Sequence, residues 1–222
     1  MRKKKNILRL VGVVIAMGFV LASCGKDTEA ADPYADWEAR NALFLDSIAN
    51  VAANPPSGEE WVKKLNFKLS NATSLDGLNS YANTDYVYMK ILPYAEENIP
   101  SEGIEPLFTD SVDVHYRGTL INGTVFDESY SDEWDARYSV PVRFAVSAVI
   151  TGWTTALQTL KEGQRAEVYI PYTLAYQTSG SGEIPGYSLL IFDLRLEKVI
   201  HPIGPDDRSR TKKTEVPEDD MK

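Results

Sequence analysis

Apolar residues recur along the chain with two different periods, which divide it into a helical N-terminal part and a strand-rich part. The stretch from Tyr34 to Ala53 is predicted to be a helix, because large apolar residues fall on one face at steps of seven, four and three: Trp37, Phe44, Ile48 and Val51. Residues 54–58 contain two prolines and a glycine and end this helix. A second short helix is predicted from Glu59 to Leu69, followed by a polar loop at 71–83.

From Thr84 onward the period is two residues, which is typical of β-strands. Strands are predicted where apolar and polar residues alternate, at residues 86–91, 112–117, 142–146, 166–170 and 189–199. Asn122-Gly123 predicts a hairpin turn. The same alternation predicts that His115 points away from the core and that one set of side chains on the last strand faces water: Asp193, Arg195 and Glu197.

One short helix interrupts the strands. Residues 152–160 carry apolar side chains at i, i+3, i+4 and i+7, and Gly163 closes the segment: Trp153, Ala156, Leu157 and Leu160. Several strands with a single helix among them indicate an α+β fold. We therefore expect an antiparallel β-sheet packed on one short α-helix, with an N-terminal helical extension.

The first 23 residues have the pattern of an export signal. A positively charged start precedes an apolar run from Leu10 to Ala22, which is short for a membrane span. The run ends in Leu21-Ala22-Ser23-Cys24, which resembles a lipobox, so we expect cleavage before Cys24 and lipid attachment to its thiol. An uncleaved N-terminal anchor with an incidental cysteine is the alternative. Cys24 is the only cysteine, which leaves no internal disulfide.

The charge of the chain excludes one class of partner. The signal holds five of the 23 basic residues and none of the 32 acidic residues, so the chain from Cys24 onward carries a net charge of −14. Such an acidic protein is a poor ligand for nucleic acid or anionic lipid, and we expect its membrane contact to come from acyl chains. The expected organisation is a signal peptide, a tether, a helical extension, a folded domain and a disordered charged tail, at residues 1–23, 24–33, 34–83, 84–200 and 201–222.

Five segments of the strand-rich part resemble the FKBP family of peptidyl-prolyl cis–trans isomerases. They are, in chain order, residues 112–120 (VDVHYRGTL), 123–127 (GTVFD), 149–153 (VITGW), 163–166 (GQRA) and 190–194 (LIFDL). The resemblance implies a twisted antiparallel β-sheet wrapped around one short α-helix. It also implies isomerase activity on proline-containing polypeptides, without a cofactor or a metal ion, and leaves a macrolide ligand open.

The resemblance assigns the aromatic residues to a pocket for the proline ring. Trp153 would be its floor, and the walls would be Tyr116, Phe126 and Phe192. Rotation about an X–Pro bond makes and breaks no covalent bond, but it must cross a barrier of about 18–20 kcal/mol because amide resonance is lost. A dry aromatic cup that binds the twisted amide better than the planar one lowers that barrier.

The resemblance also places residues around this cup. Val149 and Ile150 would line the rim, with the Ile150 N–H as a donor to the peptide, and Ile184 would contact it from a flap. Asp127 would lie beside the twisting amide, and the hydroxyl of Tyr176 would bond a ligand carbonyl. The structural alternatives stay open: Trp153 as a core residue, Asp127 as a turn cap and Tyr176 as a surface residue.

The chain departs from the family pattern at two places near the expected pocket. Val142, after Pro141, stands where the family has a pocket phenylalanine, and Phe144 is assigned to the core. The segment from Phe126 to Pro141 is longer than in the smallest family members, and it is predicted to bring aromatic residues to the edge of the pocket: Tyr130, Trp134 and Tyr138. In the flap, Gln177 replaces a usual glycine.

Three functions remain open at this point. The first is an isomerase that assists folding of exported proteins, lipid-anchored in the cell envelope at the outer membrane, facing the periplasm or the surface. The second is a catalytically weak chaperone or peptide-binding module with the same fold. The third is an adaptor that forms a homodimer through the apolar face of the N-terminal helix, since a face with Trp37, Phe44 and Ile48 has to be buried somewhere.

Overall fold

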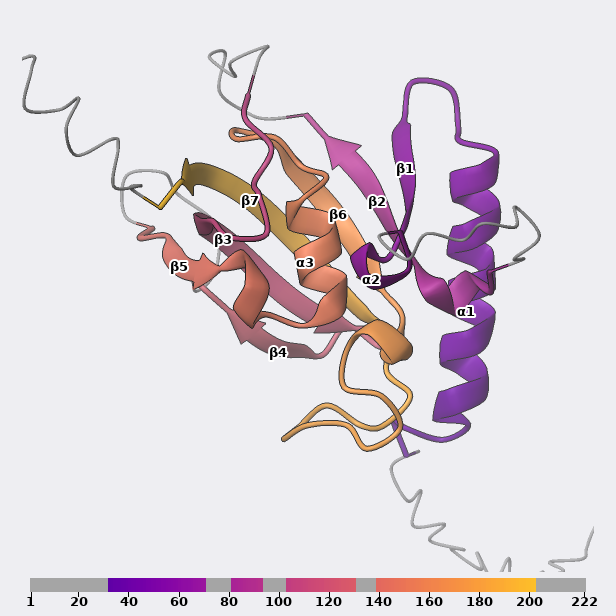
Figure 1. The fold of residues 1–222 in the computed structure, drawn as a ribbon. Helices are drawn as coiled ribbons and strands as arrows, with labels where there is room; N and C mark the ends of the chain where they lie inside the picture. Colours follow the sequence, from indigo (N-terminus) through magenta and orange to yellow (C-terminus); the bar gives the residue numbers. More distant parts are fainter. Residues whose placement is uncertain (1–31, 71–80, 94–102, 131–138, 203–222) are drawn as a thin grey trace, which may run out of the picture. The chain divides into compact units, whose positions relative to one another are not determined.

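The computed structural model describes residues 32–70, 81–93, 103–130 and 139–202, and the helices and strands of this part of the chain lie in one compact unit that starts at Pro33. Its strands form a sheet in the order β1-β2-β6-β7-β3-β4, and every pairing is antiparallel (Figure 1). β4 and β5 follow one another along the same edge of β3. The strands are β1 (Glu60–Leu65), β2 (Tyr86–Leu92), β3 (Ser111–Leu120), β4 (Val125–Glu128), β5 (Val142–Ala145), β6 (Arg165–Ile170) and β7 (Leu190–Ile200).

A short helix covers one face of this sheet. The helices are α1 (Trp37–Ala53), α2 (Phe67–Ser70) and α3 (Thr151–Leu157), with 3₁₀ turns η1 (Asn83–Asp85), η2 (Val146–Ala148) and η3 (Tyr172–Leu174). α3 lies across the sheet, and fully buried side chains of β2, β6 and β7 pack with it in one core: Val87, Met89, Val168, Ile170, Leu194 and Leu196 (Figure 1). The predicted fold class is therefore confirmed. Among the described residues, no helix combines the length and apolar character that crossing a membrane requires.

α1 packs on the opposite face of the same sheet, beside β1 and β2 (Figure 1). Leu45 and Ile48 bury their side chains against Tyr88 of β2 and Tyr169 of β6. Because successive strand residues point to opposite faces, β2 is buried on both sides. The apolar face that the sequence predicted for this helix thus packs on the chain's own sheet.

The predicted second helix at Glu59–Leu69 is wrong. Residues 60–65 form β1, which pairs with β2 along its whole length, and only Phe67–Ser70 is helical. Contacts with distant parts of the chain explain the difference. β2 has a free edge with which this segment can pair, and the side chains of the segment pack against residues of the neighbouring strands. Trp61 stacks on Tyr169 with ring centroids 5.8 Å apart, and the ammonium of Lys63 lies 4.1 Å from the ring of Tyr86. The sheet therefore begins before residue 84, where the sequence placed the start of the domain.

The outer face of the central strands is less exposed to water than the alternation predicted. His115 of β3 and Arg195 of β7 are neighbours across the two strands, and both are buried. Tyr130, which follows β4, places its ring 6.5 Å from that of His115 and so covers this face. Burial lowers the pKa of His115. The prediction that Arg195 faces water is wrong, because Tyr130, which comes from an earlier part of the chain, packs over this face.

Buried tyrosines are expected to lower the stability of the fold at alkaline pH. Burial raises the pKa of Tyr88 from 10.0 to about 12, and burial also raises the pKa of Tyr116 and Tyr169. The unfolded chain ionises first, so the free energy of unfolding is expected to be constant below about pH 10 and to fall as the pH rises toward about 12. Denaturant titrations across this range measure it. Tyr88→Phe is expected to make the fall shallower, whereas Tyr86→Phe, on the same strand, is the matched control. Equal slopes in all three proteins would contradict this account.

Candidate active site

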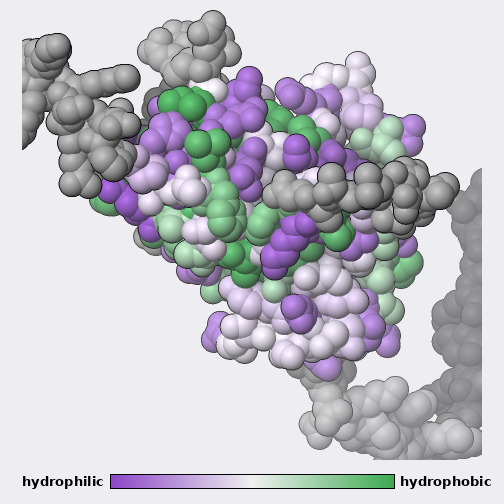
Figure 2. Space-filling model, viewed as in Figure 1, coloured by the Kyte–Doolittle hydropathy of each residue, from purple (hydrophilic) through white to green (hydrophobic). Residues whose placement is uncertain are grey.

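A cavity of about 520 Å³ opens between β3, β4, the N-terminal end of α3 and the loop of residues 177–187, which we call the pocket loop. Nine of the ten pocket residues predicted from the sequence line it: Tyr116, Phe126, Asp127, Val149, Ile150, Trp153, Tyr176, Ile184 and Phe192. The volume is that of a site for a small molecule or a few peptide residues. On this side of the molecule hydrophobic and hydrophilic residues are interspersed, whereas the loop at the bottom of the view is mostly of intermediate hydropathy (Figure 2).

The interior of the cavity is aromatic. Trp153 is only 5% exposed, and the rings of Tyr116 and Phe192 meet it edge-to-face, each with a centroid distance of 5.1 Å. Phe126 meets Phe192 in the same way at 5.4 Å. Edge-to-face pairs are a favourable arrangement of aromatic quadrupoles, so the rings hold one another in place. The result is a rigid apolar cup whose innermost member is Trp153.

A glycine of β3 allows the walls of the cup to meet. Gly118 lies opposite Phe192 of β7 and Asp127 of β4 in the register of the sheet. A Cβ at this position would lie 2.5 Å from the Phe126 ring and 2.8 Å from the Phe192 ring. Any side chain at residue 118 would therefore separate the two phenylalanines.

A hydrogen bond joins the cup to its polar edge. The Tyr116 hydroxyl donates to Oδ2 of Asp127 at 2.9 Å. Burial, with a smaller contribution from this bond, raises the pKa of Tyr116, so the hydroxyl stays protonated and the carboxylate is its acceptor. Asp127 itself is exposed. A negatively charged group is thus held at the cavity wall in a defined orientation.

The rim offers further polar groups. Within the described chain the backbone N–H of Ile150, directly before α3, makes no hydrogen bond, and it is left for a ligand. The pocket loop adds Ser181 and Glu183 to the lining, which the sequence did not predict. The lining holds two carboxylates, Asp127 and Glu183, and neither lysine nor arginine. Among the described residues, no group of three or more His, Cys, Asp or Glu side chains could hold a metal ion.

The part of the chain that contains this cavity matches a known family. Residues 103–197 match the family described as FKBP-type peptidyl-prolyl cis-trans isomerase. This chain carries an FKBP domain. The matched residues include the cup and the pocket loop, while α1, β1 and β2 precede them.

Individual relatives share this FKBP domain. The chain is 37% identical to a probable FKBP-type isomerase FkpA of Neisseria meningitidis, over 69% of this chain and 49% of the relative. It is 47% identical to a macrophage infectivity potentiator of Trypanosoma cruzi, over 41% of this chain and 44% of that protein. The chain therefore spans about half the length of these curated relatives. Among solved structures, FkpA of Escherichia coli has a TM-score of 0.51 at 28% identity, covering 75% of this chain and 60% of that one.

One expected pocket residue lies elsewhere in this FKBP domain. Val142 does not line the cavity and is 36% exposed on β5. Two residues later Phe144, which the sequence assigned to the core, lines it instead, with its ring 5.9 Å from Tyr116 and 5.5 Å from Trp153. Alternation does not separate the two residues, since residues two apart share a strand face; Val142 is the first residue of this four-residue strand, and Phe144 lies nearer to η2 and α3. Phe144 thus supplies a wall of the cup beside Tyr116 and Trp153.

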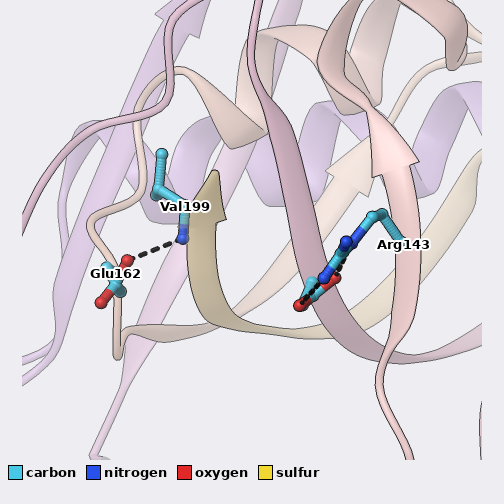
Figure 3. Close-up of polar contacts among 4 residues, drawn as sticks. Arg143, Glu162 and Val199 are labelled. Carbon is cyan, nitrogen blue, oxygen red and sulfur yellow. Dashed lines mark hydrogen bonds and ion pairs between the residues drawn. The ribbon is translucent and has the colours of Figure 1, made fainter. Parts of the chain in front are cut away.

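The neighbour of Phe144 holds β5 in place. Arg143 donates two hydrogen bonds to Asp113 of β3, at 2.7 and 2.8 Å (Figure 3). This bond pair lowers the pKa of Asp113. On the neighbouring strand β7, Oε2 of Glu162 accepts the backbone N–H of Val199 at 2.7 Å, which ties the turn after α3 to β7 (Figure 3). These bonds secure the elements that carry the cup.

Tyr130, in the long segment after Phe126, lies away from its expected position. It does not line the cavity and lies against His115 on the outer face of the sheet. Trp134 and Tyr138 lie outside the described residues. The prediction that Tyr130 reaches the edge of the pocket is wrong, because its ring packs against His115, whose side chain lies on the face opposite to that of Tyr116.

Proposed function

We propose that the protein is a peptidyl-prolyl cis–trans isomerase that acts on exported proteins at the cell envelope. The observation that carries the proposal is the aromatic cup with the Tyr116–Asp127 hydrogen bond at its edge, inside an FKBP domain. The cup has the size and apolar character for a proline ring, and the rim offers a donor and acceptors for the adjoining peptide groups.

The proposed mechanism requires binding and no covalent step. Trp153 lies under the proline ring, and Tyr116, Phe126 and Phe192 surround it. Excluding water from the X–Pro amide removes hydrogen bonds that favour the planar, resonance-stabilised form. The twisted amide loses less in such a site, so the barrier of about 18–20 kcal/mol falls.

The polar groups then orient the peptide. The N–H of Ile150 donates to a peptide carbonyl, and the hydroxyl of Tyr176 donates to another. Val149 and Ile184 contact the chain on either side of the proline. The carboxylate of Asp127 lies beside the amide and favours the charge distribution of the twisted state over that of the planar one.

A protease-coupled assay on a proline-containing tetrapeptide tests the proposal. A purified, folded sample is expected to accelerate cis-to-trans conversion, and Asp127→Val is expected to lower kcat/KM by about tenfold, since one charged contact contributes on the order of 1.5–3 kcal/mol. A rate equal to the uncatalysed one, in a sample with the circular dichroism of a folded protein, would remove the isomerase proposal and leave the peptide-binding module.

Envelope attachment is a separate part of the proposal. It is supported by the signal-like residues 1–23 and by Cys24, which lie outside the described residues. Mass spectrometry of the processed protein is expected to find a diacylglyceryl group on an N-terminal Cys24. Retention of the signal with an unmodified thiol would replace the lipid anchor by an uncleaved one. Macrolide binding and homodimer formation are open to direct measurement by inhibition and by solution mass.

The charge of the rim predicts a preference among substrates. With Asp127 and Glu183 in the lining and no basic residue there, a peptide with lysine before proline is expected to have a kcat/KM about two- to tenfold above one with glutamate. The ratio should shrink at about 0.5 M salt, because exposed charges are then screened. Glu183→Gln should reduce it, while Glu60→Gln on β1 is the matched control. A ratio insensitive to salt and to Glu183→Gln would contradict the assignment.

A further inference from the structure

The start of α1 contacts the end of the pocket loop, although this helix lies outside the matched FKBP segment. The indole Nε1 of Trp37 donates to Oγ of Ser188 at 2.9 Å, and the backbone N–H of Leu189 donates to Oδ1 of Asn41 at 2.8 Å. All four residues are less than a tenth exposed. Buried hydrogen bonds of this kind are costly to break without a replacement partner. α1 therefore holds the two residues that directly follow the loop.

The contact continues into the loop itself. Ser188 Oγ donates its only hydrogen to the backbone oxygen of Pro185 at 2.6 Å and accepts from Trp37 with a lone pair. Pro185 is bonded to Ile184, which lines the cavity. Asn41 is itself held, because its Nδ2 donates to the backbone oxygen of Trp37 at 2.8 Å. A continuous series of hydrogen bonds thus leads from α1 to the carbonyl of Pro185, the residue that follows the cavity residue Ile184.

The pocket loop is built to keep its own shape. Ser181 and Ile184 exchange two backbone hydrogen bonds, both 2.9 Å, and the N–H of Tyr187 donates to the oxygen of Gln177 at 3.0 Å. Gln177 and Tyr187, at its two ends, have positive φ angles of 57° and 63°. Residues with a side chain adopt this left-handed conformation only where the surroundings impose it. A loop that is stiff inside and strained at its ends depends on its anchors for its position.

We propose that Trp37 and Asn41 are positioning residues, which hold the pocket loop and with it Ile184 where a bound peptide is contacted. The proposal rests on the proposed function of the cavity. If the loop is released from α1, it must become ordered again when a peptide binds. This ordering cost weakens peptide binding and leaves the turnover of bound peptide unchanged. Trp37 belongs to the same buried cluster as Ile184, whereas the later turns of α1 contact the sheet through Ile48 and Tyr88.

Kinetics of the full chain provide the first test. Trp37→Phe keeps an aromatic ring and removes the donor, and Ser188→Ala removes the acceptor. Each is expected to raise KM about 3- to 10-fold, the worth of one net hydrogen bond, with kcat within about twofold. Ser188→Ala also removes the bond to Pro185, so the double variant should have the KM of Ser188→Ala, in which the bond from Trp37 is already lost. Trp61→Phe is the matched control, because it removes an indole bond to Glu59 of 2.8 Å on the opposite part of the sheet, and it should leave KM unchanged.

Amide hydrogen exchange provides the second test and does not depend on turnover. In Trp37→Phe and Ser188→Ala the amides of Ser181, Ile184 and Tyr187 are expected to exchange about tenfold faster, while those of β7 keep their rates. Equal acceleration of loop and sheet amides, unchanged loop exchange, or faster loop exchange with an unchanged KM would each overturn the proposal. If the wild-type chain showed no turnover, only the proposed function would fail. Amide hydrogen exchange would still test whether α1 holds the pocket loop.

Discussion

Replacing Trp153 with leucine is expected to reduce kcat/KM for prolyl isomerisation by at least about tenfold and the free energy of unfolding by about 2–4 kcal/mol. Trp153 is the innermost ring of the cup, and its indole meets Tyr116, Phe144 and Phe192 at centroid distances of 5.1–5.5 Å. Leucine fills only part of that volume, so the three rings lose the surface that orients them. The proline ring of the substrate loses its floor at the same time. Peptide kinetics and denaturant unfolding measure the two effects.

Trp61→Leu is the control for this change. Trp61 is also partly buried and stacked on a tyrosine, but it lies on β1 at the edge of the sheet and outside the cavity. Its replacement is expected to lower stability by about 1 kcal/mol, since the site is half open to water, and to leave kcat/KM within about twofold. If the two variants lost activity in equal measure, the cavity around Trp153 would not be the working site.

Gly152→Ala is expected to destabilise the protein by about 1–3 kcal/mol, although alanine is normally the better helix former by about 1 kcal/mol. A Cβ on residue 152 would overlap the Cγ2 atom of Ile170 and lie 3.0 Å from its Cδ1 atom. Ile170 is fully buried in β6, so it cannot move aside. α3 must then shift away from the sheet and carry Trp153 with it. A fall in kcat/KM should accompany the loss of stability.

A double-mutant cycle separates this clash from a general intolerance of the site. Ile170→Ala removes the clashing atoms and costs about 2–5 kcal/mol alone. In that background, Gly152→Ala is expected to be neutral or stabilising, because its methyl group enters the space that was vacated. Denaturant unfolding of all four proteins measures the free energies of unfolding. If the losses from the two substitutions simply added, the need for glycine at residue 152 would not come from the close approach of α3 to β6.

The residues of the cup were predictable because the resemblance to the FKBP family assigns them, and the apolar period agrees at two positions. Tyr116 belongs to a strand with clear alternation, and Trp153 belongs to a helix with four apolar residues on one face. In such segments the period settles which side chains face inward. Val142 was misplaced because the family pattern was carried to the first residue of a strand of only four residues, whose place along the cavity depends on its pairing with β3.

The parts that were not predicted depend on contacts between distant segments. Nothing within Glu60–Leu65 distinguishes a strand from a helix, and the segment becomes a strand because it pairs with the edge of β2. The burial of Arg195 likewise follows from Tyr130 folding over the outer face, about which the alternation of β7 carries no information. The bond from Trp37 to Ser188 joins residues 151 positions apart, and the sequence of neither segment reveals it.

The position of β2 in the sheet determines how short a recombinant fragment of this protein can be. β2 lies between β1 and β6, so a recombinant fragment restricted to the matched residues 103–197 would lack the strand that pairs with β6. The unpaired amide and carbonyl groups of Arg165–Ile170 would then form an open sheet edge, which recruits strands from other molecules. Without α1, the same fragment would expose Tyr169 to water. A soluble expression fragment therefore has to begin at or before residue 33, about 70 residues ahead of the family boundary.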